Sequence, residues 1–266
     1  MSHSAQSFRL ADAASLEDDL SYVWRKAMRG HQLDLPALAR ACGVDVTAIE
    51  AMISGTAISN LLEKAAEVLH LNAAAIRALP RYQPRVPNVH AVIGLRLPFE
   101  ADSVNAWLIR DEDQVLLFDT GHERDSAREA LQPLGVADLQ LFLTHDHRDH
   151  VGGIAGLRSI VKKQHAMSYG QTQRIGAMEL RCIDLSGHCI PSYGYVITGL
   201  SRTVCVVGDA LFAGSIGGCA DAFTYQMALR NLRHHVMTLP EDTVLLPGHG
   251  PVTTVGQEKR SNPFLA

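Results

Sequence analysis

The pattern of apolar and polar residues changes character near residue 85. Before it, residues 15–80 break into about five short runs that are typical of helices. After it, short β-rich runs alternate with helical ones. Three prolines in "PRYQPRVP", residues 80–87, disfavour helix and favour an extended linker. The sequence therefore predicts an all-helical region over residues 1–84 and a mixed region over residues 85–266.

The expected helices carry capping residues at their ends. Ser15 is a candidate N-cap for "SLEDDLSYVWRKAMRG", which has acids in its first turn and closes on Gly30. Asp34 opens "DLPALARACG" just before Pro36, and Gly43 ends it. We therefore expect helices that begin near Ser15 and Asp34.

A third helix, "DVTAIEAMISG" at residues 45–55, follows the tight turn Ala41-Cys42-Gly43-Val44. Short helices at this spacing over residues 18–79 resemble the Cro/C1-type helix-turn-helix domain. The resemblance implies that the third helix enters the DNA major groove.

The charge of this first region argues against DNA binding. The third helix contains Asp45 and Glu50 but no Lys or Arg, and residues 1–80 hold seven Lys and Arg against nine Asp and Glu. Phosphate contacts and guanine recognition both depend on basic side chains. We therefore expect the region to mediate self-association into a homo-oligomer or to cover the second region. The apolar residues of the third helix then pack inside the region or supply a contact surface: Ile49, Met52 and Ile53.

Eight runs of the second region are typical of strands. They are "HAVIGLRL", "VNAWLIR", "QVLLFDTG", "LQLFLTH", "MELRCID", "YGYVITG", "TVCVVGD" and "TVLLPGHG". Helical runs lie between them: "RDSAREALQPL", "GGIAGLRSIVKK" and "DAFTYQMALRNLRHHVMTL". This mixture predicts an α/β sandwich or a layered α/β sheet, and periodicity leaves both open.

Composition narrows the function classes. Hydrophobic residues make up 47% of the chain, which allows a large core. A net charge of −4 gives no global attraction to nucleic acid or anionic membranes. The sequence has neither a run of about 20 apolar residues nor a secretory signal, and its five scattered cysteines read as reduced thiols. We expect a cytoplasmic protein without a membrane partner.

The most informative stretch is "LFLTHDHRDHVGG", residues 141–153. Alternate side chains of an extended segment share a face, so His145 and His147 lie side by side at the end of a buried strand. Asp149 and His150 follow as the chain turns toward a helix. Imidazole and carboxylate together suit zinc, iron or manganese. The alternative is a hydrophilic loop with no ligand.

Three later strand ends offer further ligand types. His188, Asp209 and His249 each follow a glycine where an apolar run ends. A glycine lets the backbone approach closely there, and sites of α/β proteins lie at strand ends.

The ordered set His-x-His-x-Asp-His, His188, Asp209 and His249, with "LLFDTG" at residues 116–121, resembles the metallo-β-lactamase superfamily. The resemblance implies an αββα sandwich and two divalent metal ions, with zinc expected and iron or manganese as alternatives. It also implies catalysis by Asp149 and Asp209 and attack by a hydroxide between the metals. Asp119 would orient the ligand loop by hydrogen bonds. The implied ligands are His145, His147 and His188 for one metal, Asp149, His150 and His249 for the other, and Asp209 for both.

Two segments, "GDALFAGSIGG" (208–218) and "PGHGPVTTVGQEKRSNPFL" (247–265), resemble the glyoxalase II-like branch. That implies hydrolysis of a small acyl thioester such as an S-acylglutathione. The chain departs from the branch at Gly218, where short members carry Arg. We also expect no counterpart of the C-terminal helical domain of full-length glyoxalase II. The alternatives are a lactonase or other ester hydrolase, a mononuclear iron persulfide dioxygenase, and a DNA-binding regulator that senses a metal or metabolite.

Overall fold

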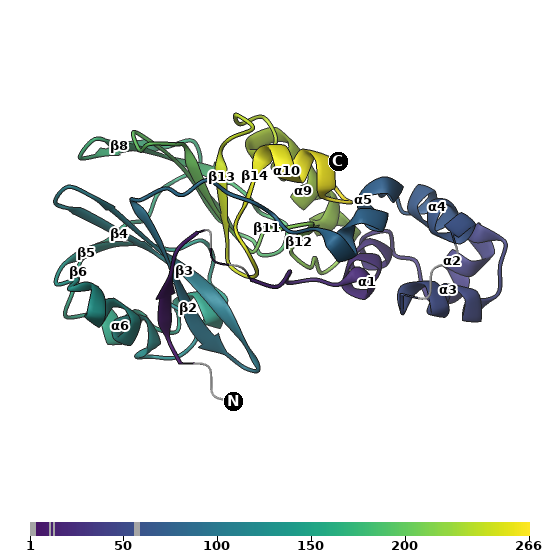
Figure 1. Ribbon diagram of the computed structural model, residues 1–266, viewed down its shortest axis with the longest axis horizontal. Helices are drawn as coiled ribbons and strands as arrows, with labels where there is room; N and C mark the ends of the chain where they lie inside the picture. Colours follow the sequence, from purple (N-terminus) through teal and green to yellow (C-terminus); the bar gives the residue numbers. More distant parts are fainter. Residues whose placement is uncertain (1–3, 11, 13, 56–58) are drawn as a thin grey trace.

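The computed structural model describes all residues except 1–3, 11, 13 and 56–58. Two six-stranded sheets form its centre, and the first has the order β1-β2-β3-β4-β5-β6 (Figure 1). Its four leading strands pair antiparallel, and β4, β5 and β6 pair parallel. The strands are β1 (Gln6–Phe8), β2 (Val92–Phe99), β3 (Asp102–Asp111), β4 (Gln114–Phe118), β5 (Leu139–Phe142) and β6 (Val161–Gln164).

The second sheet has the order β14-β13-β10-β9-β8-β7, in which β10 and β13 are parallel. A small hairpin, β11 (Leu211–Phe212) with β12 (Ser215–Ile216), follows β10. The strands of the sheet are β7 (Thr172–Ile175), β8 (Met178–Asp184), β9 (Tyr193–Thr198), β10 (Val204–Gly208), β13 (Val244–Pro247) and β14 (Thr253–Thr254).

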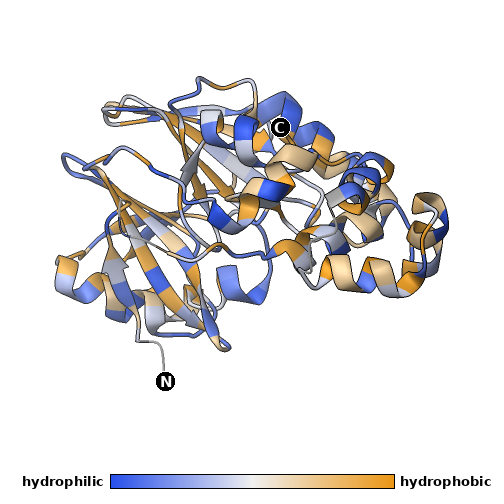
Figure 2. Cartoon of the chain, turned by 45° about the vertical axis from the view of Figure 1, so that its right-hand side comes forward, coloured by the Kyte–Doolittle hydropathy of each residue, from blue (hydrophilic) through white to orange (hydrophobic). Residues whose placement is uncertain are grey.

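Three buried clusters show how the layers stack. One lies between the sheets and includes Trp107, Phe118 and Tyr195. A second fills the space between the first sheet and α6 (Ser126–Leu131). The third covers the outer face of the second sheet with α9 (Ala222–Asn231) and α10 (Val255–Ser261). The central strands are accordingly largely apolar, for example β4, β10 and β13, and orange residues run along strands of both sheets (Figure 2). The expected αββα sandwich is therefore the observed architecture.

The first region contributes five helices to the third cluster. Its helices α2 to α4 lie at the far end of the molecule from the sheets (Figure 1). Helix α1 contacts α9, and helix α5 contacts α10. Ile49, Met52 and Ile53 are buried, so they pack inside this region and do not form a free surface. The helices are α1 (Leu20–Gly30), α2 (Leu35–Cys42), α3 (Val46–Ile53), α4 (Ser59–Val68) and α5 (Ala73–Ala78), followed by a 3-10 turn at Leu79–Arg81.

Helix ends in this region only partly follow the sequence prediction. Asp34 caps α2 by accepting a hydrogen bond from the Ala37 amide, and Gly43 closes it in the left-handed conformation, as predicted. The prediction of Ser15 as an N-cap is wrong, because α1 begins at Leu20 with Asp19 as its cap.

The expectation that residues 1–84 are all helical is wrong at residues 6–8. These residues form β1, which pairs antiparallel with β2 and extends the first sheet. The first region therefore adds an edge strand to the first sheet, whereas its helix α1 contacts α9.

All eight predicted strands are present, but short elements were missed or misassigned. The helix expected over residues 152–163 covers only α8 (Ile154–Leu157), and Val161–Gln164 is strand β6. The long helix expected after residue 221 changes at residue 232 into a π-helical turn, Leu232–Val236. Among the described residues, no helix has both the length and the apolar character needed to cross a membrane.

Candidate metal centre

The ends of several strands converge on one cluster of histidines and carboxylates. His145 follows β5, and His150 lies in the one-turn helix α7 (Arg148–Val151). Asp209 follows β10 and His249 follows β13; because these strands are parallel, their carboxyl ends meet at one edge. The structure thus brings all seven predicted ligands into two neighbouring groups, His145, His147 and His188 in the first and Asp149, His150, Asp209 and His249 in the second.

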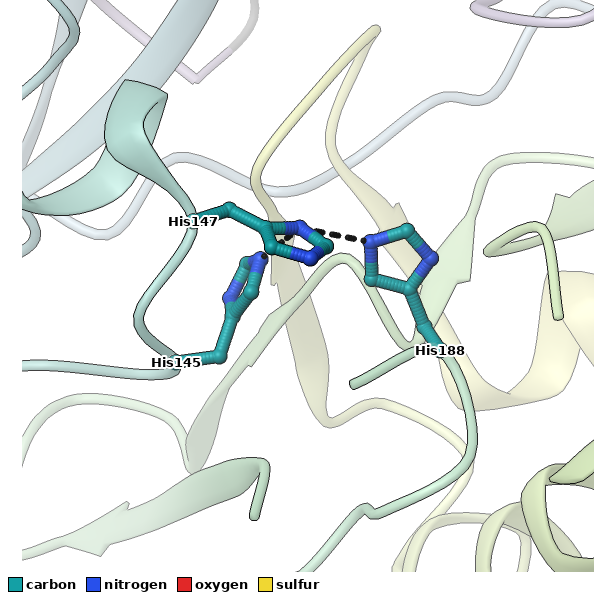
Figure 3. Close-up of side chains that lie close together, drawn as sticks. All are labelled: His145, His147 and His188. Carbon is teal, nitrogen blue, oxygen red and sulfur yellow. Dashed lines mark hydrogen bonds between the residues drawn. The ribbon is translucent and has the colours of Figure 1, made fainter. Parts of the chain in front are cut away.

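The first group is a set of three imidazoles that face one another (Figure 3). The His147 Nδ1 atom lies 3.1 Å from the His145 Nε2 atom and 3.1 Å from the His188 Nε2 atom. Ligand nitrogens at the about 2.0–2.1 Å bond length of zinc are roughly 3.3 Å apart in a tetrahedron. The spacing of the three nitrogens therefore suits a single cation.

The second group is almost fully buried. The His249 Nε2 atom lies 3.2 Å from the Asp149 Oδ2 atom and 3.5 Å from the Asp209 Oδ2 atom. The His150 Nε2 atom lies 3.3 Å from the Asp209 Oδ1 atom. The Asp209 Oδ2 atom is also 3.8 Å from the His188 Nε2 atom of the first group. One carboxylate, that of Asp209, therefore faces both groups.

Four of the five histidines are held through the ring nitrogen that points away from the cluster. The Nδ1–H groups of His188 and His249 donate to the carbonyl oxygens of Gly218 (2.7 Å) and Ser103 (3.1 Å). His150 Nδ1 donates to the Asp119 carboxylate, and His145 Nδ1 bonds the Thr144 hydroxyl. Each of these bonds fixes the tautomer that leaves Nε2 free for a ligand.

Asp119 is not in either group, as expected, and it holds one histidine from each. Its Oδ2 atom accepts hydrogen bonds from His150 Nδ1 and from the Thr144 hydroxyl, both at 2.8 Å. The same hydroxyl lies 3.0 Å from His145 Nδ1. The Asp119 Oδ1 atom accepts from the Thr144 amide at 2.8 Å. The buried carboxylate of Asp119 therefore ties β4 to the beginning of the ligand loop.

The unpaired polar atoms, the space beside them and the ligand types of this site are those expected for a cation site. Among the described residues, the His150 Nε2 and Asp209 Oδ1 atoms are buried without a hydrogen-bond partner, although they are strongly polar. Gly248 leaves room beside them, since a Cβ atom there would lie 2.1 Å from Asp209 Oδ1. Two adjacent sets of imidazole and carboxylate donors match the preferences of zinc, iron and manganese. The residues present therefore fit divalent metal ions.

Comparison with known proteins agrees with this geometry. Residues 100–175, which include the whole ligand loop, match the family model of the metallo-beta-lactamase superfamily. This part of the second region is therefore similar to the metallo-beta-lactamase superfamily. Proteins with this fold bind divalent metals at His and Asp clusters of this kind.

Individual relatives are more distant. The chain is 27% identical to the probable metallo-hydrolase YqgX of Bacillus subtilis, over 64% of this chain and 96% of the relative. It is 25% identical to the hydroxyacylglutathione hydrolase GloC of Haemophilus influenzae, again over 64% and 96%. The crystal structure of the BLEG-1 B3 metallo-beta-lactamase superposes with a TM-score of 0.55 at 26% identity, over 64% of this chain and 98% of that one.

The pKa values show how the candidate metal centre is charged without a cation. Burial lowers the pKa of His145 to about 4. Burial also opposes protonation of His249, but the Asp209 and Asp149 carboxylates raise its pKa to about 9. Asp209 and Asp119 likewise overcome burial and raise the pKa of His150 well above its usual value. A cation must therefore displace protons from His150 and His249 when it binds.

Sequence reasoning missed several residues that hold this site. Thr144, which links Asp119 to His145, precedes the motif but carries no signal of its own. Asp18 and Lys26, from the first region, bond the hairpin beside His188. Lys26 and Ile216 are 190 positions apart in the sequence, so no local pattern could join them.

Proposed function

We propose that this chain is a dinuclear metal-dependent hydrolase that attacks a thioester of the S-acylglutathione kind. The observation that carries the proposal is the placement of the Asp209 carboxylate between the two ligand groups. In this proposal one metal is held by His145, His147 and His188, the other by Asp149, His150 and His249, and both by Asp209.

Two bound divalent cations would supply Lewis acidity and lower the pKa of water toward about 7. The chain's own residues prepare the site for them. The Nδ1 contacts of the histidines fix the ring orientations, so little reorganisation is needed when a ligand arrives. The Asp209 and Asp149 carboxylates would offset the positive charge of two neighbouring cations. Burial opposes ionisation of Asp149, but the hydrogen bond from His249 outweighs it and lowers the pKa of this carboxyl.

The thioester part of the proposal rests on residues 208–218. This segment carries the glyoxalase II-like pattern and forms one wall of the site, because a Cβ atom at Gly217 would lie 2.9 Å from the His188 Cβ atom. Curated relatives at 25–31% identity carry the name hydroxyacylglutathione hydrolase. Both facts favour a glutathione thioester over a lactone or another ester.

The test compares hydrolysis of S-lactoylglutathione by the metal-loaded protein, the chelator-treated protein and two variants. His147→Ala should abolish turnover, because it removes the nitrogen that lies between His145 and His188. His234→Ala is the matched control, because this exposed histidine lies in neither group. We expect measurable but slow turnover, since Gly218 offers no side chain to the substrate.

The same assay separates the alternatives. A panel with an acyl lactone and glutathione persulfide identifies the competing activities. Hydrolysis of the lactone alone would replace the thioester proposal with a lactonase. Oxygen consumption with the persulfide and a single iron per chain would favour the mononuclear dioxygenase. That outcome would leave the complete second group, Asp149, His150, Asp209 and His249, without a metal to explain it.

A further inference from the structure

A buried ion pair in the first region contacts the hairpin beside the metal centre. The Lys26 ammonium, on α1, contacts the Asp18 carboxylate, and the two side chains are only 14% and 5% exposed. Lys26 Nζ also donates to the carbonyl oxygen of Ile216 at 2.8 Å. The Ser215 hydroxyl donates to the same carboxylate oxygen of Asp18 at 2.5 Å. Helix α1 and the segment before it are therefore bonded to β12.

The two residues that follow the hairpin, Gly217 and Gly218, contact the predicted ligands. Gly217 lies so close to the Asp209 segment that a Cβ atom would be 1.8 Å from the Asp209 carbonyl oxygen. Gly218 accepts the Nδ1–H hydrogen bond of His188 at 2.7 Å. A shift of the hairpin would therefore move the acceptor that orients the His188 ring.

Lys26 is not placed to act as a free cation for an anionic substrate. An ammonium group has three donors, and Asp18 and Ile216 take two of them. The Asp18 carboxylate also neutralises its charge. The ammonium further lies over the ring of Phe212, 4.9 Å from its centroid, which holds the side chain against β11. These contacts favour a role in holding the hairpin.

We propose that Asp18 and Lys26 are positioning residues of the metal centre, which act on His188 through residues 215–218. The helical region is then a required part of the site. The proposal depends on the metal-binding part of the proposed function and is independent of its thioester substrate.

The test measures cobalt(II) binding to the metal-free protein by its visible absorbance, which reports the ligand geometry directly and needs no turnover. Lys26→Met removes the bond to Ile216 and should weaken binding at the His145, His147 and His188 group about ten-fold, the lower end of the effect of losing a residue that orients a ligand. Lys162→Met is the matched control, because Lys162 forms an exposed ion pair with Asp138 at 2.8 Å.

A second variant separates loss of positioning from loss of folding. Lys26→Met alone leaves the Asp18 carboxylate buried without its cation, which destabilises a protein strongly. The double variant Asp18→Asn/Lys26→Met removes both charges and still lacks the bond to Ile216, so it should fold and bind cobalt more weakly. Ser215→Ala removes one hydroxyl from the same network and should weaken cobalt binding several-fold. This variant provides the test if the double variant does not fold.

The outcomes are distinct for the two proposals. Wild-type cobalt affinity and spectra in the folded double variant, or in Ser215→Ala, would overturn the positioning role. A wild-type protein that binds no cobalt would overturn both this role and the proposed metal centre. Weakened cobalt binding in the variants, together with no turnover of any thioester by the wild type, would support the positioning role and refute only the substrate.

Discussion

Asp119→Asn replaces one carboxylate oxygen by an NH₂ group. Asp119 is the residue that holds histidines from both ligand groups. Asp119 has a φ of 64°, in the left-handed region that Asn also tolerates, so the backbone is not strained by the change. The amide oxygen can still accept from the Thr144 amide, as Oδ1 does now. The new NH₂ group then faces His150 Nδ1, which is itself a donor.

The size of the effect follows from this donor-to-donor contact. His150 can avoid the contact only by moving its proton to Nε2, the atom that faces Asp209 and would bind the metal. Loss of such an orienting partner costs about 10–100-fold in metal affinity. At about 1.4 kcal/mol for each factor of ten, this is roughly 1.4–2.7 kcal/mol. His145 is held only through the Thr144 hydroxyl, which can reorient, so the first group should change much less.

Competitive titration with a chelator measures the two affinities of the wild type and of Asp119→Asn. We expect one site to weaken 10–100-fold and the other to stay within a few-fold. Asp146→Asn is the matched control, because Asp146 is an exposed acid of the same loop whose Oδ1 atom accepts from the Cys189 thiol. Equal weakening of both sites, or an effect of Asp146→Asn as large as that of Asp119→Asn, would refute the tautomer argument.

Three further predictions concern the shared carboxylate, pH and DNA. Asp209→Ala should lower bound metal to less than one equivalent per chain by elemental analysis, because Asp209 faces both groups; full occupancy would refute a shared ligand. The pKa of His249 is about 9 in the metal-free fold against 6.5 ordinarily, so its stabilisation is complete below about pH 6.5 and is lost as the pH rises through about 9. The melting temperature measured with a chelator should therefore fall over this range, and a rise would contradict the assignment. Fluorescence anisotropy at low salt should detect no binding to duplex DNA, because α3 has no Lys or Arg; salt-sensitive binding would show that the helix-turn-helix resemblance outweighs charge.

Local sequence features predicted the longer strands and the candidate ligands. A strand such as β5 is a short apolar run that must be buried whatever surrounds it, so its position is visible in the sequence. His145, His147, Asp149 and His150 lie within six residues of one another, and this spacing alone indicated a metal site. The other candidate ligands each follow a glycine at the end of an apolar run, and their order along the chain resembles the metallo-β-lactamase superfamily. The short edge strands β1, β6 and β7 gave too few residues for a periodic signal.

Contacts between distant segments were decided only by the tertiary structure. Ser15 and Asp19 are both good helix caps, and local sequence cannot choose between them; in the structure Asp18 pairs with Lys26 and bonds Ser215, which fits a helix that begins at Leu20. The first region has a helical pattern of apolar residues, whereas the second alternates strands and helices, so the sequence predicts two separate units. In the structure, the apolar faces of the helices join the cluster that covers the second sheet. Side-chain periodicity records which residues are buried, but not which partner buries them. The link from Lys26 to the hairpin beside His188 therefore depends on how the layers pack.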